Sequence, residues 1–558
     1  MKLKTKLCSS LAKVLPATAP EGADFRSASA LQGEIFSFQM AYCPVNFQGY
    51  EVKAEIESTL SEFISCYHVE LIPVDYPGQL FDDDYISTHP GLFPDRLGRV
   101  PEKGAKAVFG QWRAYWIKVA LPKDIPGGKY EISITLSAAP DPKDTFFKGK
   151  PVVKTSVFTL EVIPLQLPEQ TLTLTNWFHA DCLASYYKQE VFSEAHWQTM
   201  EKFFRCATAH GINLLLTPLF TLPLDTAFGH ERPTCQLVKV RCDKGQYSFD
   251  FSLLTRWITL AQKCGFKEFE MSHLFSQWGA EYTPKIVATV DGCEKRIGGW
   301  DVRADSAEYI QFIDAFLPAL TAYLKEKGLQ DKVYFHCSDE PQKQHTASYI
   351  FAAELLKKYL NGFRILDALT DVKFYRMGYV THPVPLEAHL DPFIKAGVPE
   401  LWTYYCCGPA DVYPNRLIAM PSSRNRVLGS LLYYYDIKGF LHWGFNFYYS
   451  QYSLHEIDPY RSADAGATFP AGDAFVVYPG VDGEPENSLR HEVFFEALQD
   501  QRALQLLERF MSRKAIQKML DKFAPDGKMT MKSYPKGEKN VLAVRKKINT
   551  LLKKFCNA

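Results

Sequence analysis

Two patterns of apolar residues divide the chain. Between about residue 20 and residue 165, short segments alternate apolar and polar positions, which is the period-2 pattern of half-buried strands. Clear examples are residues 33–42, 111–119 and 129–136, and Pro-Gly turns separate several such segments. Because short alternating strands with such turns are typical of a β-sandwich, we predict an N-terminal β-sandwich domain over residues 1–168.

After residue 168, short apolar segments alternate with segments of helical period. The apolar segments predict strands at residues 171–178, 212–218, 267–275, 332–337, 364–369, 378–381, 400–405 and 439–447. The helical segments are residues 193–210, 250–264, 304–327, 341–360 and 415–435. This alternation predicts a (β/α)8 barrel over residues 169–489. Residues 490–558 predict C-terminal helices packed on the barrel, so we expect a multidomain protein with α/β and all-β parts.

Composition and charge narrow the possible partners and the compartment. The 63 Lys and Arg residues balance the 63 Asp and Glu residues, so we expect no nucleic-acid partner. The 13 cysteines include no Cys-x-x-Cys pair, and no apolar run is long enough to span a bilayer or to form a signal peptide. We therefore expect a cytoplasmic protein with no membrane partner. Zinc-ligand spacings, a P-loop and a Gly-x-Gly-x-x-Gly motif are absent from the sequence, and we expect no cofactor.

The most informative chemical feature is the dipeptide Asp339-Glu340, which directly follows the predicted strand 332–337 and precedes Pro341. Carboxylates at the end of a core strand are costly unless they do chemistry. In a (β/α)8 enzyme the active site lies at the carboxyl ends of the strands, where these two residues would lie. The alternative is that Asp339 only caps a helix that begins near Pro341. The position of the pair inside a β/α repeat favours catalysis.

Two neighbouring carboxylates suit glycoside hydrolysis, in which one carboxyl group is protonated and the other is ionised. We expect the N-terminus of the following helix to favour the ionised form of Asp339, which leaves Glu340 as the acid. Many retaining (β/α)8 glycosidases carry a glutamate nucleophile at the carboxyl end of strand seven. Here Glu400 lies at the amino end of the predicted strand 400–405, and the predicted strand 439–447 has no carboxylate. A protein nucleophile is therefore missing from that place. The 2-acetamido oxygen of the substrate can take that role by forming an oxazolinium. Two alternatives remain open: a glycosidase of another substrate class whose nucleophile is unplaced, and a non-catalytic carbohydrate-binding protein.

Residues 336–341, His-Cys-Ser-Asp-Glu-Pro, resemble the strand-four catalytic motif of glycoside hydrolase family 123, the retaining β-N-acetylgalactosaminidases. Residues 401–409, 439–446, 472–480 and 488–492 resemble the associated DUF4091 domain. The resemblance runs from about residue 177 to residue 507. It implies a β-sandwich before a (β/α)8 barrel, no metal, and a glycan substrate, either an oligosaccharide or a glycoconjugate, that ends in N-acetylgalactosamine (GalNAc). It also implies that Asp339 orients the acetamido group and that Glu340 is the acid/base.

Aromatic and polar residues near the predicted strand ends are candidates for substrate binding. We expect Trp443 to stack on a sugar face and Tyr404 to bond the acetamido oxygen. The further candidates are Tyr405, Asn446, Trp177, His179, Asp181, His273, Trp278 and His336. For each of them the alternative is a role in core packing or capping. We expect Cys406 and Cys407 to form barrel wall, Asp473 to make a buried polar link, and the loops 223–246 and 275–300 to shape the binding cavity.

Overall fold

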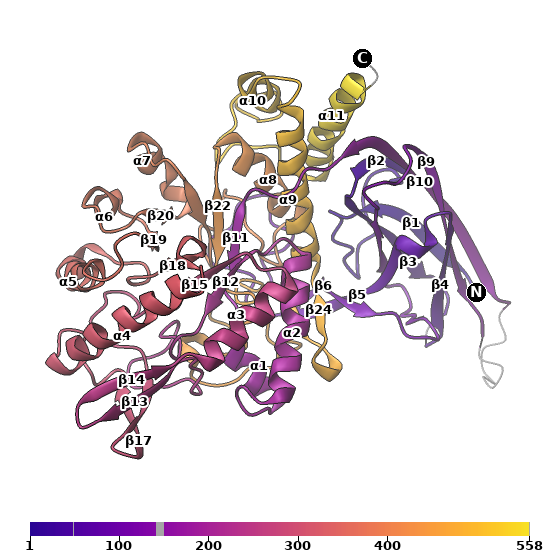
Figure 1. Cartoon of the computed structure of the whole chain (residues 1–558). Coiled ribbons are helices and arrows are strands. Elements are labelled where there is room, and N and C mark those ends of the chain that lie inside the picture. Colours follow the sequence, from indigo (N-terminus) through magenta and orange to yellow (C-terminus); the bar gives the residue numbers. More distant parts are fainter. Residues whose placement is uncertain (48, 141–149, 557–558) are drawn as a thin grey trace.

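The strands predicted after residue 168 form one eight-stranded parallel sheet in the computed structural model, which describes residues 1–47, 49–140 and 150–556 (Figure 1). In sheet order the strands are β20 (His382–Pro385), β19 (Arg364–Leu369), β18 (Val333–Phe335), β15 (Glu268–Met271), β12 (Leu214–Thr217), β11 (Thr173–Asn176), β22 (Gly439–His442) and β21 (Trp402–Tyr404). A parallel bridge between Leu386 and Tyr404 brings the two outer strands together. The sheet is therefore a nearly closed barrel, as the sequence predicted.

Helices cover the outside of this barrel. They are α1 (Ala180–Tyr187), α2 (Glu194–Ala209), α3 (Ser252–Cys264), α4 (Ala307–Glu326), α5 (Thr346–Lys357), α6 (Val372–Arg376), α7 (Leu390–Lys395) and α8 (Ser422–Tyr434). Local chemistry sets several boundaries, because the Ser193 side chain caps α2 by accepting a bond from the His196 N–H and α3 ends at Gly265 with φ +108°. The predicted helices 193–210, 250–264 and 304–327 are confirmed within a few residues.

Three barrel elements begin at least four residues later than predicted. The sixth strand is β20 and lies after residues 378–381, because Pro383 and Pro385 hide its apolar pattern. Helix α8 begins at Ser422 instead of residue 415. Helix α5 begins at Thr346 instead of Pro341, and a short 3-10 turn, Lys343–His345, precedes it. The chain after β18 is therefore a loop at the position where a helix N-terminus was expected.

The loops after β12 and β15 build a small sheet of their own, which was not predicted. Its four strands, in order, are β14 (Gln246–Asp250), β13 (Lys239–Asp243), β16 (Ile286–Val290) and β17 (Cys293–Gly298). Figure 1 shows this sheet projecting from the barrel beside α4. We call it the insert sheet, and the loops that lead to it border the mouth of the barrel.

The N-terminal region contains two five-stranded sheets. One has the order β1 (Leu3–Ser9), β3 (Ile35–Pro44), β8 (Arg113–Ala120), β5 (Ile64–Val74), β6 (Gly91–Arg99); the other has the order β2 (Ser27–Gln32), β10 (Val152–Gln166), β9 (Gly128–Ala138), β4 (Glu51–Ser58), β7 (Ala105–Lys106). Both sheets contribute to one apolar core, in which the rings of Phe38 and Phe158 stack with centroids 4.2 Å apart. The β structure begins at Leu3, earlier than the expected start near residue 20.

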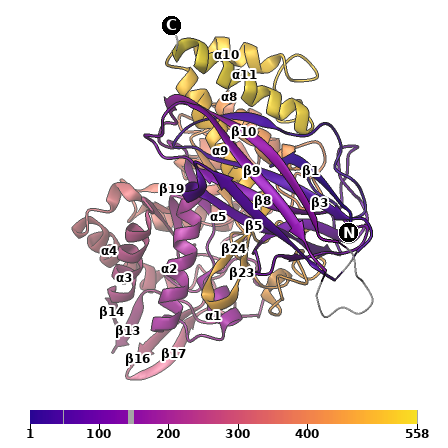
Figure 2. The same cartoon turned by 90° about the vertical axis from the view of Figure 1, so that its right-hand side faces the viewer.

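The C-terminal residues form α9 (Leu489–Leu507), α10 (Arg513–Asp521) and α11 (Glu538–Cys556). Helix α9 is buried along almost its whole length. Figure 1 shows α11 beside β2 and β10, and Figure 2 shows it beside β10. Over the described ranges of the chain, no helix is long and apolar enough to cross a membrane.

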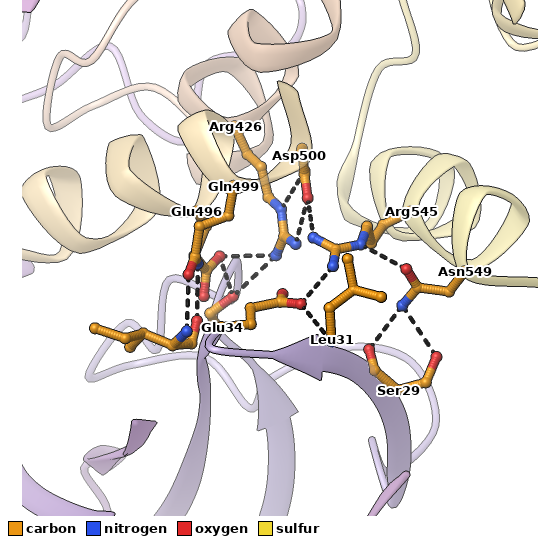
Figure 3. A network of polar contacts seen from close by, with 11 residues as sticks. Ser29, Leu31, Glu34, Arg426, Glu496, Gln499, Asp500, Arg545 and Asn549 are labelled. Atoms are coloured by element: carbon orange, nitrogen blue, oxygen red, sulfur yellow. Dashed lines mark hydrogen bonds and ion pairs between the residues drawn. The ribbon is translucent and has the colours of Figure 1, made fainter. Parts of the chain in front are cut away.

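A buried network of charged groups joins the N-terminal sheets to these helices (Figure 3). Arg426 of α8 lies 2.7 Å from Glu496 and 2.8 Å from Asp500, both on α9. Arg545 of α11 lies 2.7 Å from Asp500 and 2.5 Å from Glu34, which stands in the turn between β2 and β3. All five side chains are buried. A buried charge is costly unless it is paired, and each member of this network is paired with a group on another element.

Candidate active site

A cavity of about 170 Å³ opens at the carboxyl ends of the barrel strands. Seven of its lining residues were predicted for the site: Trp177, His179, Trp278, Asp339, Glu340, Tyr404 and Trp443. The volume is below the range of roughly 300–1,000 Å³ that is usual for drug-sized ligands, so the cavity suits a small ligand. The cavity lies where the active site of a (β/α)8 enzyme is expected.

The loop after β18 brings both carboxylates to this cavity. Neighbouring residues of a strand point to opposite faces, but β18 ends at Phe335, and Glu340 has a left-handed backbone with φ +43°. A positive φ is uncommon for a residue other than glycine, and such conformations concentrate at functional sites. The loop is held by the Asp339 carbonyl, which accepts a bond of 2.9 Å from the Trp278 N–H, and by Ser338, whose hydroxyl donates to the Ser276 carbonyl at 3.0 Å.

The two carboxyl groups influence each other's protonation. Burial raises the pKa of Asp339 well above its usual range, and the charge of Glu340 raises it further. Burial also raises the pKa of Glu340, although the Tyr404 hydroxyl, which donates to Glu340 Oε1, opposes this rise. The expected ionisation of Asp339 by a helix N-terminus is wrong for the free protein, because α5 begins only at Thr346. Adjacent like charges favour a state in which the pair holds one proton.

His336 lies inside the barrel and is not part of the cavity lining. Its Nε2 is 2.6 Å from Glu270 Oε1, and its Nδ1 is 3.3 Å from Asp367 Oδ1. Burial opposes the charged imidazolium, but these hydrogen bonds prevail and raise the pKa of His336 to about 9. At neutral pH His336 is therefore a cation between two carboxylates, and its charge lowers the pKa of Asp339.

His273 stacks on His336, with 4.1 Å between the ring centroids, and also lies outside the cavity lining. Neither of its ring nitrogens has a hydrogen-bond partner among the residues that the structure describes. Burial and the charge of His336 lower the pKa of His273 well below its usual range. His273 is thus a neutral packing partner of the imidazolium.

Three further candidates do not line the cavity, and two of them support its wall. Asp181 forms two bonds of 2.8 Å with Arg232, and both side chains are buried. Asn446 accepts from the His179 N–H at 2.9 Å and donates to the His179 carbonyl at 3.0 Å. Tyr405 is fully buried away from the cavity. Asp181 and Asn446 position His179, whose pKa is lowered to about 3 by burial and by Arg232.

Two carboxylates that were not predicted for the site also line the cavity. Asp473 Oδ2 accepts a bond of 3.1 Å from Trp443 Nε1, and burial raises the pKa of Asp473 to about 7. Asp225 accepts from the Tyr452 N–H at 3.0 Å, and burial raises the pKa of Asp225 to about 6. The other lining residues that were not predicted individually are Leu224, Gln277, Ala368, Cys406, Cys407, Leu441, Gln451, Tyr452 and Phe469. Leu224, Asp225, Gln277 and Trp278 belong to the loops 223–246 and 275–300, which were expected to shape the cavity.

Among the residues that the structure describes, two groups of buried or half-buried side chains have possible metal ligands within 4.8 Å of one another: His273 with His336 and Asp367, and Cys206 with His210 and His491. Both nitrogens of His336 already bond carboxylates. His210 likewise bonds the Cys206 carbonyl and Glu492. A metal in either group would have to replace these hydrogen bonds.

The comparisons with known proteins agree with a carbohydrate-active barrel. A family model described as "Glycoside hydrolase 123, catalytic domain" matches residues 177–507, which is more than half of the chain. The protein is therefore a glycoside hydrolase. The chain belongs to glycoside hydrolase family 123. No curated protein matches it.

Among solved structures, a family 123 glycoside hydrolase from Clostridium perfringens is similar over 100% of this chain and 99% of its own, with a TM-score of 0.75 and 16% identity. This likeness shows a common fold. The macrocyclisation catalyst AvmM has a TM-score of 0.16 and 11% identity over 28% of this chain and 88% of its own. The pilin subunit BcpA of Bacillus cereus has a TM-score of 0.15 and 10% identity over 32% of this chain and 44% of its own. These two likenesses carry no argument.

Proposed function

We propose that the protein is a retaining, exo-acting glycoside hydrolase that releases β-linked 2-acetamido sugars, with GalNAc preferred, by a substrate-assisted mechanism. The observation that carries this proposal is the adjacent pair Asp339 and Glu340 in a cavity of about 170 Å³. The preference for GalNAc rests on the family resemblance. The description of the relative from Clostridium perfringens, which concerns glycolipid glycan hydrolysis, supports a glycan as the substrate.

In this mechanism Glu340 protonates the glycosidic oxygen as the bond to the anomeric carbon breaks. The 2-acetamido carbonyl oxygen attacks that carbon from the opposite face and forms an oxazolinium. Asp339 accepts the acetamido N–H, and this hydrogen bond favours the ionised form of Asp339 and leaves the shared proton on Glu340. Glu340 then takes a proton from the water that attacks the anomeric carbon, the oxazolinium opens, and the configuration is retained.

The surroundings of the pair support these roles. The His336 imidazolium favours the negative charge on Asp339 that the oxazolinium requires. The Tyr404 hydroxyl bonds one oxygen of Glu340, which leaves the other oxygen free to transfer a proton. We place Trp443 against a face of the sugar, since its indole lines the cavity and is oriented by Asp473.

The test is a panel of aryl β-glycosides with and without the 2-acetamido group, together with a thiazoline that mimics the oxazolinium. We expect turnover only of the 2-acetamido glycosides and competitive inhibition by the thiazoline. Equal turnover of β-galactosides, or resistance to the thiazoline, would contradict the proposal.

The second candidate is a glycosidase with a protein nucleophile, and the observation that favours it is that Asp473 lines the same cavity. A nucleophile must be ionised and free, whereas the pKa of Asp473 is raised to about 7 and one of its oxygens is bonded to Trp443. Mass spectrometry after incubation with a 2-deoxy-2-fluoro glycoside distinguishes the two candidates, because a glycosyl ester on Asp473 forms only in the second.

We also propose the domain boundaries 1–168 for a β-sandwich, 169–489 for the catalytic barrel and 490–558 for the C-terminal helices. The separate apolar core of the two N-terminal sheets supports the first boundary. Limited proteolysis tests it, because stable fragments should end close to residue 168.

A further inference from the structure

A second cavity adjoins the one that contains Asp339 and Glu340. Its volume is about 560 Å³, and it shares Gln277, Trp278 and Tyr452 with the smaller cavity. The rings of Trp278 and Tyr452 meet edge to face with centroids 6.0 Å apart. A ligand held in the smaller cavity can therefore continue past these two rings into the larger one.

Three further aromatic rings gather in the second cavity. Phe228 lies 5.3 Å from Tyr282 and 5.6 Å from Trp300, and Tyr282 lies 5.9 Å from Trp300, measured between ring centroids. Phe228 is 67% exposed and Trp278 is 39% exposed. Exposed aromatic groups of this size mark binding surfaces, because covering them with a ligand removes apolar area from water.

These aromatic residues come from the loops that carry the insert sheet. Phe228 lies between β12 and β13, Tyr282 lies between β15 and β16, and Trp300 follows β17. The barrel repeat alone would not place them here. The loops that flank the insert sheet therefore supply one wall of the second cavity.

The remaining lining groups are mostly uncharged hydrogen-bonding side chains. They include Gln277, Gln342, Gln344, Thr226 and Ser276. Aromatic faces beside amides and hydroxyls match sugar rings, which present C–H faces and hydroxyl edges. A lipid tail would cover the same amides without offering them partners, which costs free energy.

We propose that the second cavity binds the leaving-group side of the substrate and holds at least two sugar residues there. This inference rests on the proposed function, because an exo-acting enzyme places the terminal sugar beside Glu340 and directs the rest of the glycan outward. The second cavity has more than three times the volume of the first, which accommodates more than one ring. The preferred substrate is thus an oligosaccharide of three or more sugars.

The test compares kcat/KM for a trisaccharide that ends in β-linked GalNAc with kcat/KM for p-nitrophenyl β-GalNAc. In Phe228→Ala and in Trp300→Ala, the ratio of the first to the second should fall at least about fivefold, because the single aryl ring does not extend to the lost aromatic face. Phe109→Ala is the matched control, since Phe109 is an exposed phenylalanine of the N-terminal region (57% exposed). Its ratio should equal that of the wild type.

An unchanged ratio in both cavity variants overturns the proposal. So does a loss seen only when the trisaccharide is joined to a long alkyl chain, since the cavity would then hold the lipid. If the wild type hydrolyses neither substrate, the proposed function has failed. Calorimetric titration with the disaccharide leaving group then tests separately whether the second cavity binds sugars. Binding by the wild type and by Phe109→Ala, with at least about fivefold weaker binding by Phe228→Ala, supports a sugar site. Absence of binding to the wild type overturns it.

Discussion

Nε2 of His336 lies 2.6 Å from Oε1 of Glu270 in the interior of the barrel. Glu270 also accepts bonds of 2.7 Å from the Thr175 hydroxyl and from Trp177 Nε1. One buried carboxylate thus connects the cation that acts on Asp339 to an aromatic residue of the cavity wall. Replacing either partner of the pair should affect both stability and catalysis.

The charge of His336 predicts a pH-dependent stability. The folded-state pKa is about 9 and the usual value is 6.5, so this contribution to the unfolding free energy is complete below pH 6.5 and is lost as the pH rises through 9. The charged or titratable groups around His336 are Glu270, Asp367, Asp339 and His273. We expect His336→Gln to be destabilised more at pH 6 than at pH 9.5, by at least about 1 kcal/mol. Chemical denaturation at the two pH values measures this, and equal destabilisation at both would refute a charged His336.

Removing either member of the catalytic pair should abolish most activity. Glu340→Gln removes the acid and Asp339→Asn removes the acceptor for the acetamido N–H, so each should lower kcat on an unactivated glycoside by about 10²- to 10⁴-fold. Circular dichroism should show an unchanged fold. The matched control is Glu400→Gln, which alters an exposed glutamate just before β21 and should retain wild-type turnover. Near-normal hydrolysis by both pair variants would mean that the catalytic groups lie elsewhere.

Tyr404→Phe should move the pH profile of the enzyme. The Tyr404 hydroxyl lowers the pKa of Glu340, so its loss raises that pKa. Because the acid must be protonated, the basic limb of kcat/KM should shift to higher pH. Tyr405→Phe removes the neighbouring hydroxyl, which has no partner among the described residues. If the basic limb shifts equally in Tyr404→Phe and Tyr405→Phe, the hydrogen bond between Tyr404 and Glu340 is not the cause of the shift.

Arg545→Met should destabilise the whole protein. The substitution leaves Glu34 and Asp500 buried without one of their cationic partners, and breaking a buried ion pair from one side costs about 3–5 kcal/mol. Lys123→Ala breaks the exposed pair with Glu169 and should cost less than about 1 kcal/mol. Denaturant unfolding of the two variants makes the comparison, and similar costs would show that the network contributes little.

Much of the barrel follows from local patterns. The strand predicted at residues 364–369 coincides with β19, and the Ser193 cap places the start of α2 correctly. The first strand, Leu3–Ser9, was missed because its alternating lysines resemble a charged tail, and only pairing with β3 makes them the outer face of a sheet. Pairing with distant segments carries no local signal.

Prediction of the candidate active site has the same limit, because contacts with distant segments leave no local signal. Asp339 and Glu340 were found because a strand end and two carboxylates are visible in a few neighbouring residues. Asp181 was misplaced because its partner Arg232 lies 51 residues away in an irregular loop. Asp473 also comes from an irregular segment, and only the folded chain brings it to Trp443. Periodicity identifies strands, but it does not tell where a side chain beyond the strand will point.

The contact between Arg545 and Glu34 spans 511 residues of sequence and has a consequence for synthesis. At about 5–20 residues per second, a ribosome makes Glu34 roughly half a minute to two minutes before it makes Arg545. During that interval the Glu34 carboxylate lacks this buried partner and is better accommodated in contact with water. The N-terminal sheets can therefore pack against α11 only when the chain is nearly complete. Nascent chains that stall before residue 545 should expose this contact surface to chaperones and proteases.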